Sequence, residues 1–411
     1  MQWTIAQIQK LLGEQIATVR VSVFLIGIST LIFFTLLIHH LFEDWYVAIF
    51  SSILLQYSPV FYYYTINPIP DNMAFSFGMA YIYYIVKHRH GKKSAHLILA
   101  GIFLGLSSLC KLQYLMLSVV SITYFINDIL RGEGKIKSGL IKYAIPQLIL
   151  ILPTLVWYTW VIKGWSGNPI LTGKLNEPFN FNEYKEIFNF HCKTMFPNFL
   201  ASKPIWIFLI IGIVEFYRNQ KQKLWQYSLI MITFIFLFFE FRPIGKVHDY
   251  YLMPFLYWIY VILAYGLDFV LKLRFGLLIV ICISIISSFH TSIESKYKWT
   301  MEETFLNKDV FIHSEELKNV VSHQERCIIL NDPSRYVFSY RIDKMGYIFH
   351  SDHLPIGWVN DLVVNHNVKF MYSDSRKVDE TEEFQQYIDS LLLQKGSIKV
   401  FKLKRPDDNT R

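Results

Sequence analysis

The chain has 411 residues, of which 53% are hydrophobic and 17% aromatic, and its formal net charge is +8. The apolar residues form blocks that are too long and too closely spaced for a soluble core, which excludes an ordinary globular enzyme and predicts a polytopic membrane protein. Lysine and arginine crowd into short loops between these blocks, as in Lys87–Lys93, which indicates membrane topology rather than nucleic-acid binding.

Residues 1–17 begin with an amphipathic stretch, Met1–Glu14. They lack a cationic region followed by an apolar core and a cleavage site, so the sequence predicts no signal peptide. We expect an interfacial helix here, the remnant of a first external loop. The four cysteines are scattered and show no spacing typical of a metal or redox site.

Residues 18–291 are expected to form the transmembrane domain. Several of its apolar runs are shorter than the roughly 20 residues that a perpendicular span needs. The region 97–127 is therefore either one kinked pair or a helical hairpin. The predicted membrane segments are 19–41, 45–64, 71–86, 97–110, 112–127, 143–162, 204–216, 225–241, 250–270 and 275–290.

The cations predict the orientation, because cytoplasmic loops of membrane proteins are enriched in Lys and Arg. The loops assigned to the cytoplasm are 87–96, 131–142, 217–224 and 272–274. The opposite face then holds loop 65–72, Lys111, loops 163–203 and 242–249, and everything after 291. An even number of spans leaves both termini outside, which favours a chain truncated at its start over a first segment that crossed unaided.

Residues 292–411 have the composition of a small soluble α/β domain, which the topology places on the external side. Strand-like runs occupy 326–330, 368–372 and 398–403, and 359–365 reads as a helix. The expected fold class is mainly α: a polytopic transmembrane helix bundle with a small C-terminal α/β extracytoplasmic domain.

Three polar clusters fall on the predicted external face. The first is Asn67–Asn72, where two prolines hold an extended turn and Asp71 enters the first turn of the next helix. A carboxylate suits the positive end of the helix dipole, so simple capping is the alternative to a functional role. The second is Lys111, which interrupts an apolar stretch and is either a counter-charge for phosphate or a lysine that snorkels to the interface.

The third cluster comprises Arg242, Lys246, His248, Asp249, Tyr250 and Tyr251, at the mouth of the apolar run 250–270. If a helix begins near Tyr250, its free backbone N–H groups, Lys246 and His248 converge on an anion. The tyrosines then add hydrogen bonds or stack on a sugar ring. The alternative is an aromatic and cationic belt at the membrane interface, although such a belt does not require His248 and Asp249.

The segments Ser58–Phe61, Pro70–Ala74 and Lys246–Pro254 resemble motifs of the bacterial members of the dolichyl-phosphate-mannose protein mannosyltransferase family, which include the aminoarabinose transferases of lipid A. These are membrane glycosyltransferases of the C superfamily. The resemblance covers residues 10–290, and its motifs are specific as a set rather than singly.

The resemblance implies an enzyme that moves a sugar from a polyprenyl phosphate to an acceptor at the outer face. Carried over by motif, Asp71 is a catalytic acidic residue and Lys111 a cation near the donor phosphate, while His248, Tyr250 and Tyr251 belong to a donor-binding element. The family's central acid lies in a first external loop that has no counterpart here. The resemblance therefore implies that the chain is a fragment, and it does not decide whether this fragment is an active enzyme.

The chemistry fits, because cleavage of a sugar–phosphate bond needs cations at the phosphate and carboxylates at the anomeric carbon. We count Asn67, Arg242, Lys246 and Asp249 among the donor-binding candidates. A divalent metal bridging Asp71 and His248 is allowed by residue type but not indicated by spacing. Apart from such a metal, the sequence indicates no cofactor, and no nucleic-acid partner is expected.

The function predicted from the sequence is transfer of a sugar from a polyprenyl-phosphate donor to a lipid, glycan or protein acceptor in the cell envelope, by a multi-pass protein of the bacterial plasma membrane. Two alternatives stay open. A transporter or flippase of a lipid-linked saccharide would place charges near the bilayer midplane, whereas the clusters here lie at one edge. A non-catalytic protein would bind the donor without transferring the sugar.

Overall fold

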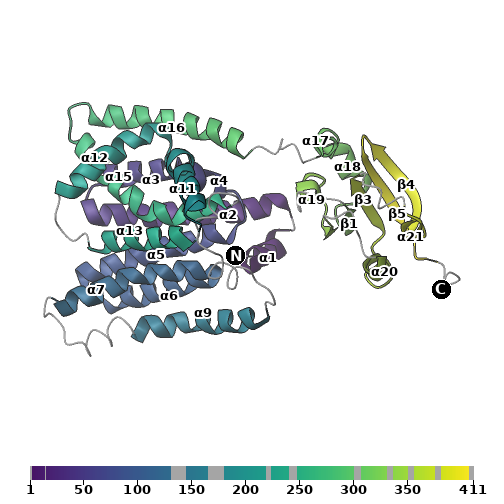
Figure 1. The fold of residues 1–411 in the computed structure, drawn as a ribbon, viewed down its shortest axis with the longest axis horizontal. Helices are drawn as coiled ribbons and strands as arrows, with labels where there is room; N and C mark the ends of the chain where they lie inside the picture. Colours follow the sequence, from purple (N-terminus) through teal and green to yellow (C-terminus); the bar gives the residue numbers. More distant parts are fainter. Residues whose placement is uncertain are drawn as a thin grey trace. The chain divides into compact units, whose positions relative to one another are not determined.

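A computed structural model describes the chain in two units, Met1–Lys298 and Trp299–Arg411. Figure 1 shows both units: the first is helical, and the second contains a small sheet. The described residues are 2–13, 15–130, 145–164, 180–218, 224–239, 248–299, 307–330, 337–349, 356–374 and 381–406.

Each of the predicted membrane segments is mainly helical where it is described, so the mainly α fold class is confirmed. The helices of the first unit are α1 (Gln2–Leu12), α2 (Ile16–Phe42), α3 (Trp45–Gln56), α4 (Pro59–Tyr64), α5 (Pro70–Gly91), α6 (Ser94–Cys110), η1 (Leu112–Ser118), α7 (Val119–Leu130), α9 (Ile145–Gly164), α11 (Phe181–Phe190), η3 (His191–Leu200), η4 (Lys203–Ile205), α12 (Trp206–Arg218), α13 (Leu224–Phe239), η5 (Asp249–Phe255), α15 (Leu256–Leu271) and α16 (Gly276–Lys298).

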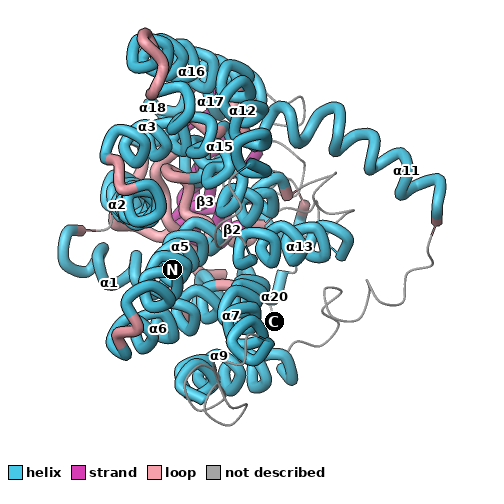
Figure 2. The backbone as a smooth tube through the Cα atoms, turned by 90° about the vertical axis from the view of Figure 1, so that its left-hand side faces the viewer, coloured by secondary structure: helices cyan, strands magenta, loops and turns pink. Residues whose placement is uncertain are grey.

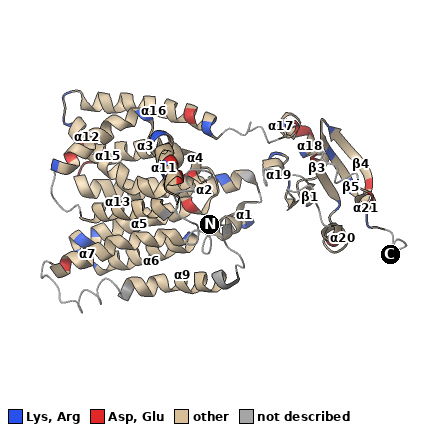
Figure 3. Cartoon of the chain, viewed as in Figure 1, with Lys and Arg blue, Asp and Glu red and all other residues tan. Residues whose placement is uncertain are grey.

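Length and composition make this a multi-pass membrane protein. Within the described residues, four helices are long and apolar enough to cross a membrane: Ala17–Phe42, Leu112–Leu130, Asp249–Leu271 and Gly276–Lys298. A fifth span arises if the pair Phe181–Leu200 and Lys203–Arg218, bent by 93°, counts as one. Figure 3 shows the charged residues gathered mainly toward helix ends, with long uncharged stretches between them.

The central helices form a row in which neighbours in sequence are mostly neighbours in space. Helix α5 packs between α2 and α6, and α9 covers the other side of α6, as Figures 1 and 2 show. Helices α12 and α15 cross closely, because a Cβ on Gly266 would lie 2.0 Å from the Phe208 carbonyl oxygen and one on Gly212 would lie 2.2 Å from that of Ile262. Such small residues let membrane helices approach closely.

Two predicted segments are broken, and both breaks shape the site. The segment 45–64 divides into α3 and α4 because Pro59 has no N–H to continue the first helix. The region 97–127 divides at Lys111, whose backbone is extended (φ −156°, ψ 116°) between α6 and the 3₁₀ helix η1. That region is therefore two helical segments joined at Lys111.

The second unit contains the small sheet expected from the sequence, with strand order β2-β1-β3-β5-β4. Strand β1 pairs in parallel with β2 and β3, whereas β5 is antiparallel to β3 and β4. The sequence analysis did not predict β2 and β4. The elements are α17 (Lys308–Ile312), α18 (Ser314–Val320), β1 (Cys327–Leu330), α19 (Val337–Arg341), β2 (Gly346–Ile348), α20 (Ile356–Val364), β3 (Phe370–Asp374), α21 (Glu382–Gln385), β4 (Ile388–Lys395) and β5 (Ile398–Leu403).

The units divide later than position 292, where the composition changes. Helix α16 continues past its apolar part to Lys298. Glu294 pairs with Lys298 and, at a longer distance, with His290, one turn away on either side. Such i, i+4 contacts support a helix beyond the point where apolar packing ends.

Candidate functional site

The site is built around the start of α5. Pro70 occupies the first turn, where its missing N–H costs nothing, and Asp71 follows it. Asp71 is only 3% exposed, an unusual degree of burial for a carboxylate. Capping at an exposed helix end would not require this burial, so a partner for the charge is needed.

That partner is Lys111. Its Nζ lies 2.7 Å from Asp71 Oδ1, and the two side chains are 17% and 4% exposed respectively. The pairing follows from the fold, because α5 and α6 pack together and the Ser107 hydroxyl on α6 donates to the Ala74 carbonyl on α5 at 2.7 Å. Helix α6 ends just before Lys111, and this places Lys111 beside the first turn of α5.

Two tyrosines complete the surroundings of the lysine. The Lys111 Nζ lies 3.8 Å from the ring centroid of Tyr251 and 4.9 Å from that of Tyr250. Both are cation–π distances. The structure therefore brings together the three clusters that were separate in the sequence, with Lys111 at their meeting point.

Helix α4 joins the same group. The Tyr64 hydroxyl donates to Asp249 Oδ1 at 2.5 Å, and its ring packs edge-on against Tyr250 at 5.6 Å. The Tyr250 hydroxyl lies 2.9 Å from His248 Nδ1. Tyr64 was not among the predicted site residues, because its sequence signal is lost in the aromatic run 61–64, which reads as an interface belt.

The remaining predicted residues have different positions. Asn67 donates its amide to the Tyr63 carbonyl at 2.7 Å and so supports the turn after α4. Arg242 and Lys246 lie outside the described residues. The binding roles expected for these three residues stay predictions.

The helical segment begins at Asp249, close to the expected start near Tyr250, but its first turns are not α-helical. Residues 249–255 form the 3₁₀ helix η5, and the α-helix begins only at Leu256. Phe255 and Leu256 are buried, so the N-terminal N–H groups of α15 lie inside the bundle. The polar groups near the Asp71–Lys111 pair come from the segment 248–251. The anion-binding role expected for this segment stays a prediction.

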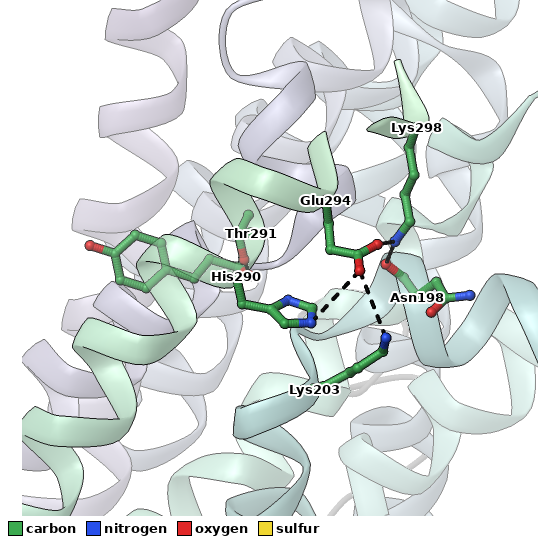
Figure 4. Close-up of polar contacts among 7 residues, drawn as sticks. Asn198, Lys203, His290, Thr291, Glu294 and Lys298 are labelled. Carbon is green, nitrogen blue, oxygen red and sulfur yellow. Dashed lines mark hydrogen bonds and ion pairs between the residues drawn. The ribbon is translucent and has the colours of Figure 1, made fainter. Parts of the chain in front are cut away.

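A second polar cluster lies at the end of α16, as Figure 4 shows. Glu294 lies 3.0 Å from Lys298, 3.7 Å from Lys203 and 3.9 Å from His290. Lys298 also donates to the Asn198 carbonyl at 2.6 Å, which ties α16 to η3. The spacing 290, 294, 298 on one helix face was the available signal, but the composition change at 292 hid it.

Metal binding has little support from geometry. Across the described parts of the chain, no group of three or more His, Cys, Asp or Glu side chains is arranged to hold a metal ion. Asp71 is paired with Lys111, whereas His248 contacts Tyr250.

Comparison with known proteins agrees with this architecture. Residues 1–157 match the family model described as dolichyl-phosphate-mannose-protein mannosyltransferase. The crystal structure of apo ArnT from Cupriavidus metallidurans superposes with a TM-score of 0.58 at 9% sequence identity, covering 97% of this chain and 86% of that chain. The structure of the same protein bound to undecaprenyl phosphate gives 0.57 and 10%, with the same coverage. No curated protein sequence gives a significant match.

The chain has the fold of ArnT. The resemblance inferred from the motifs around Asp71 and His248 is thereby confirmed. The family model covers the first of these motifs, together with Lys111. The segment 248–251 lies beyond the matched residues but within the region that the ArnT fold covers.

Proposed function

We propose that this chain binds a polyprenyl-phosphate sugar at the Asp71–Lys111 pair and transfers the sugar to a lipid, glycan or protein acceptor at the outer face of the plasma membrane. The observation that carries the proposal is a buried carboxylate and a lysine 2.7 Å apart, next to two aromatic rings. The fold of a protein known to bind undecaprenyl phosphate supports the donor class.

Each residue has a role set by charge. The acceptor oxygen attacks the anomeric carbon, and the bond from that carbon to the phosphate oxygen breaks. The electron pair leaves with the lipid phosphate, so Lys111 stabilises the developing negative charge. Asp71 takes the proton from the acceptor hydroxyl. Tyr250 and Tyr251 present their ring faces and pack against the sugar.

The test separates binding from transfer. The purified full chain is incubated in nanodiscs with a polyprenyl-phosphate sugar labelled in the sugar. Bound donor is measured after separation from free lipid, and released or transferred sugar is measured by chromatography. We expect binding that Lys111→Met abolishes and turnover that Asp71→Asn abolishes while binding persists.

The outcomes distinguish the alternatives. Binding without any turnover would make the chain a donor-binding protein. Movement of intact labelled donor between bilayer leaflets, measured in sealed vesicles, would favour a flippase. Wild-type binding in the Lys111→Met variant would contradict the site assignment.

A further inference from the structure

Tyr114 is a buried residue three positions after Lys111 of the candidate site. It occupies the first turn of η1, where its backbone N–H donates to the Lys111 carbonyl at 3.0 Å. The side chain is 1% exposed, and its ring packs edge-on against Tyr257 with centroids 6.5 Å apart. The Tyr257 hydroxyl in turn donates to the carbonyl of Phe75, which lies one helical turn after Asp71 on α5. Tyr114 therefore packs beside the first turns of the helix that carries Asp71.

The Tyr114 hydroxyl differs from the hydroxyls of two other buried tyrosines, Tyr257 and Tyr260. It has no hydrogen-bond partner within the described residues. By contrast, the Tyr257 hydroxyl donates to the Phe75 carbonyl at 2.9 Å and the Tyr260 hydroxyl to the Leu200 carbonyl at 3.2 Å. Buried polar groups are nearly always paired, so an unpaired donor three residues after Lys111 calls for a functional reason.

The proposed function supplies that reason. If Lys111 is to hold the donor phosphate, it has to leave Asp71 or share its ammonium group between two anions. A carboxylate that is 3% exposed would then lose its cation, which is strongly unfavourable for a buried charge. A neutral hydroxyl already in place can offset this loss, because hydrogen bonds to charged groups are stronger than neutral ones.

We propose that Tyr114 is a positioning residue: its hydroxyl donates to the Asp71 carboxylate when Lys111 turns to the phosphate of the lipid ligand. The inference rests on the proposed function and deepens it. In the ligand-bound state the Tyr114 hydroxyl would form a hydrogen bond to Asp71, which it does not form in the present structure. It also explains how a buried carboxylate stays ionised while its lysine serves the ligand.

The experiment compares Tyr114→Phe with Tyr260→Phe in the full chain, with undecaprenyl phosphate as the probe. Each variant removes one buried hydroxyl and keeps the ring. Tyr114→Phe should weaken binding roughly 10-fold or more and leave the melting temperature unchanged or raised. Tyr260→Phe should lower the melting temperature, since it strands a carbonyl, and leave binding unchanged.

A double-mutant cycle tests whether Tyr114 acts through Asp71. In an Asp71→Asn background, Tyr114→Phe should no longer affect binding. An effect of equal size in that background would mean that the hydroxyl contacts the ligand directly, and it would overturn the inference. So would wild-type affinity in Tyr114→Phe, or a loss of thermal stability matching that of Tyr260→Phe. Absence of binding by the unmodified chain would instead overturn the proposed function itself.

Discussion

Two carboxylates of the helical unit are held by lysines, yet in different surroundings. Asp71 has a 4% exposed side chain and is paired with Lys111 inside the bundle, whereas the side chain of Glu294 is 26% exposed and lies near several cations. Water cannot reach Asp71 to replace a lost partner, whereas it can reach Glu294. The difference teaches that burial, not residue type, decides what breaking an ion pair costs.

The largest effect is expected at the buried pair. Lys111→Met should lower the free energy of unfolding by about 3–5 kcal/mol, because it leaves Asp71 buried without a cation. Chemical denaturation in detergent, followed by tryptophan fluorescence, measures this change. The double variant Lys111→Met/Asp71→Asn should recover most of the stability. If Lys111→Met alone were as stable as the wild type, the buried pair would be no more important for stability than the accessible pair at Glu294.

A smaller effect is expected at the second carboxylate of the site. Tyr64→Phe removes a hydrogen bond to charged Asp249 and should lower the free energy of unfolding by about 1.5–3 kcal/mol. Donor affinity should fall as well, because Asp249 adjoins Tyr250. Tyr62→Phe on the same helix is the control. Equal effects of the two variants would argue against a specific role for the Tyr64–Asp249 contact.

At the exposed cluster the effect should be small. Glu294→Gln should change the free energy of unfolding by no more than about 1 kcal/mol, as for other solvent-accessible ion pairs. Donor binding should not change. A large destabilisation, seen in the same denaturation assay, would show that the tie between α16 and η3 is as important as the buried pair.

The smallest effect is local and concerns a carboxylate held by a neutral donor. The Ser397 hydroxyl and N–H both donate to Asp309 Oδ2 at 2.7 Å, and they lower the pKa of Asp309 below its ordinary value of 3.8. A depressed pKa means that the contact stabilises the fold at neutral pH and is lost as the pH falls through the folded-state value. Hydrogen exchange at the Ser397 amide should therefore accelerate below about pH 3.8. In Asp309→Asn this acid dependence should disappear.

The sequence predicted the helices well because long apolar runs are a local property. It also singled out Asp71 and Lys111, since charges that interrupt apolar stretches are conspicuous. It did not predict that the two form a pair, because 40 residues separate them and only the packing of α5 on α6 joins them. Tyr64 and Tyr114 were missed because tyrosine is common at membrane boundaries and carries no charge to mark it.

The short elements were the hardest to predict. Strand β2 is three residues long and includes Gly346, so no alternation is visible in it. The 3₁₀ helix before α15 was read as part of one α-helix, because its tyrosines and Leu252 continue the apolar run without a break. Pro254 was the local sign of the irregularity.

By itself, the sequence determined that this is a multi-pass helical protein with a small α/β unit, because both properties follow from the spacing of apolar residues along the chain. The tertiary structure decided which polar side chains meet. Asp71, Lys111 and the segment 248–251 come from three distant parts of the chain, and only the antiparallel packing of the helices brings their ends together. Burial then turns a short contact between two charges into a strong one.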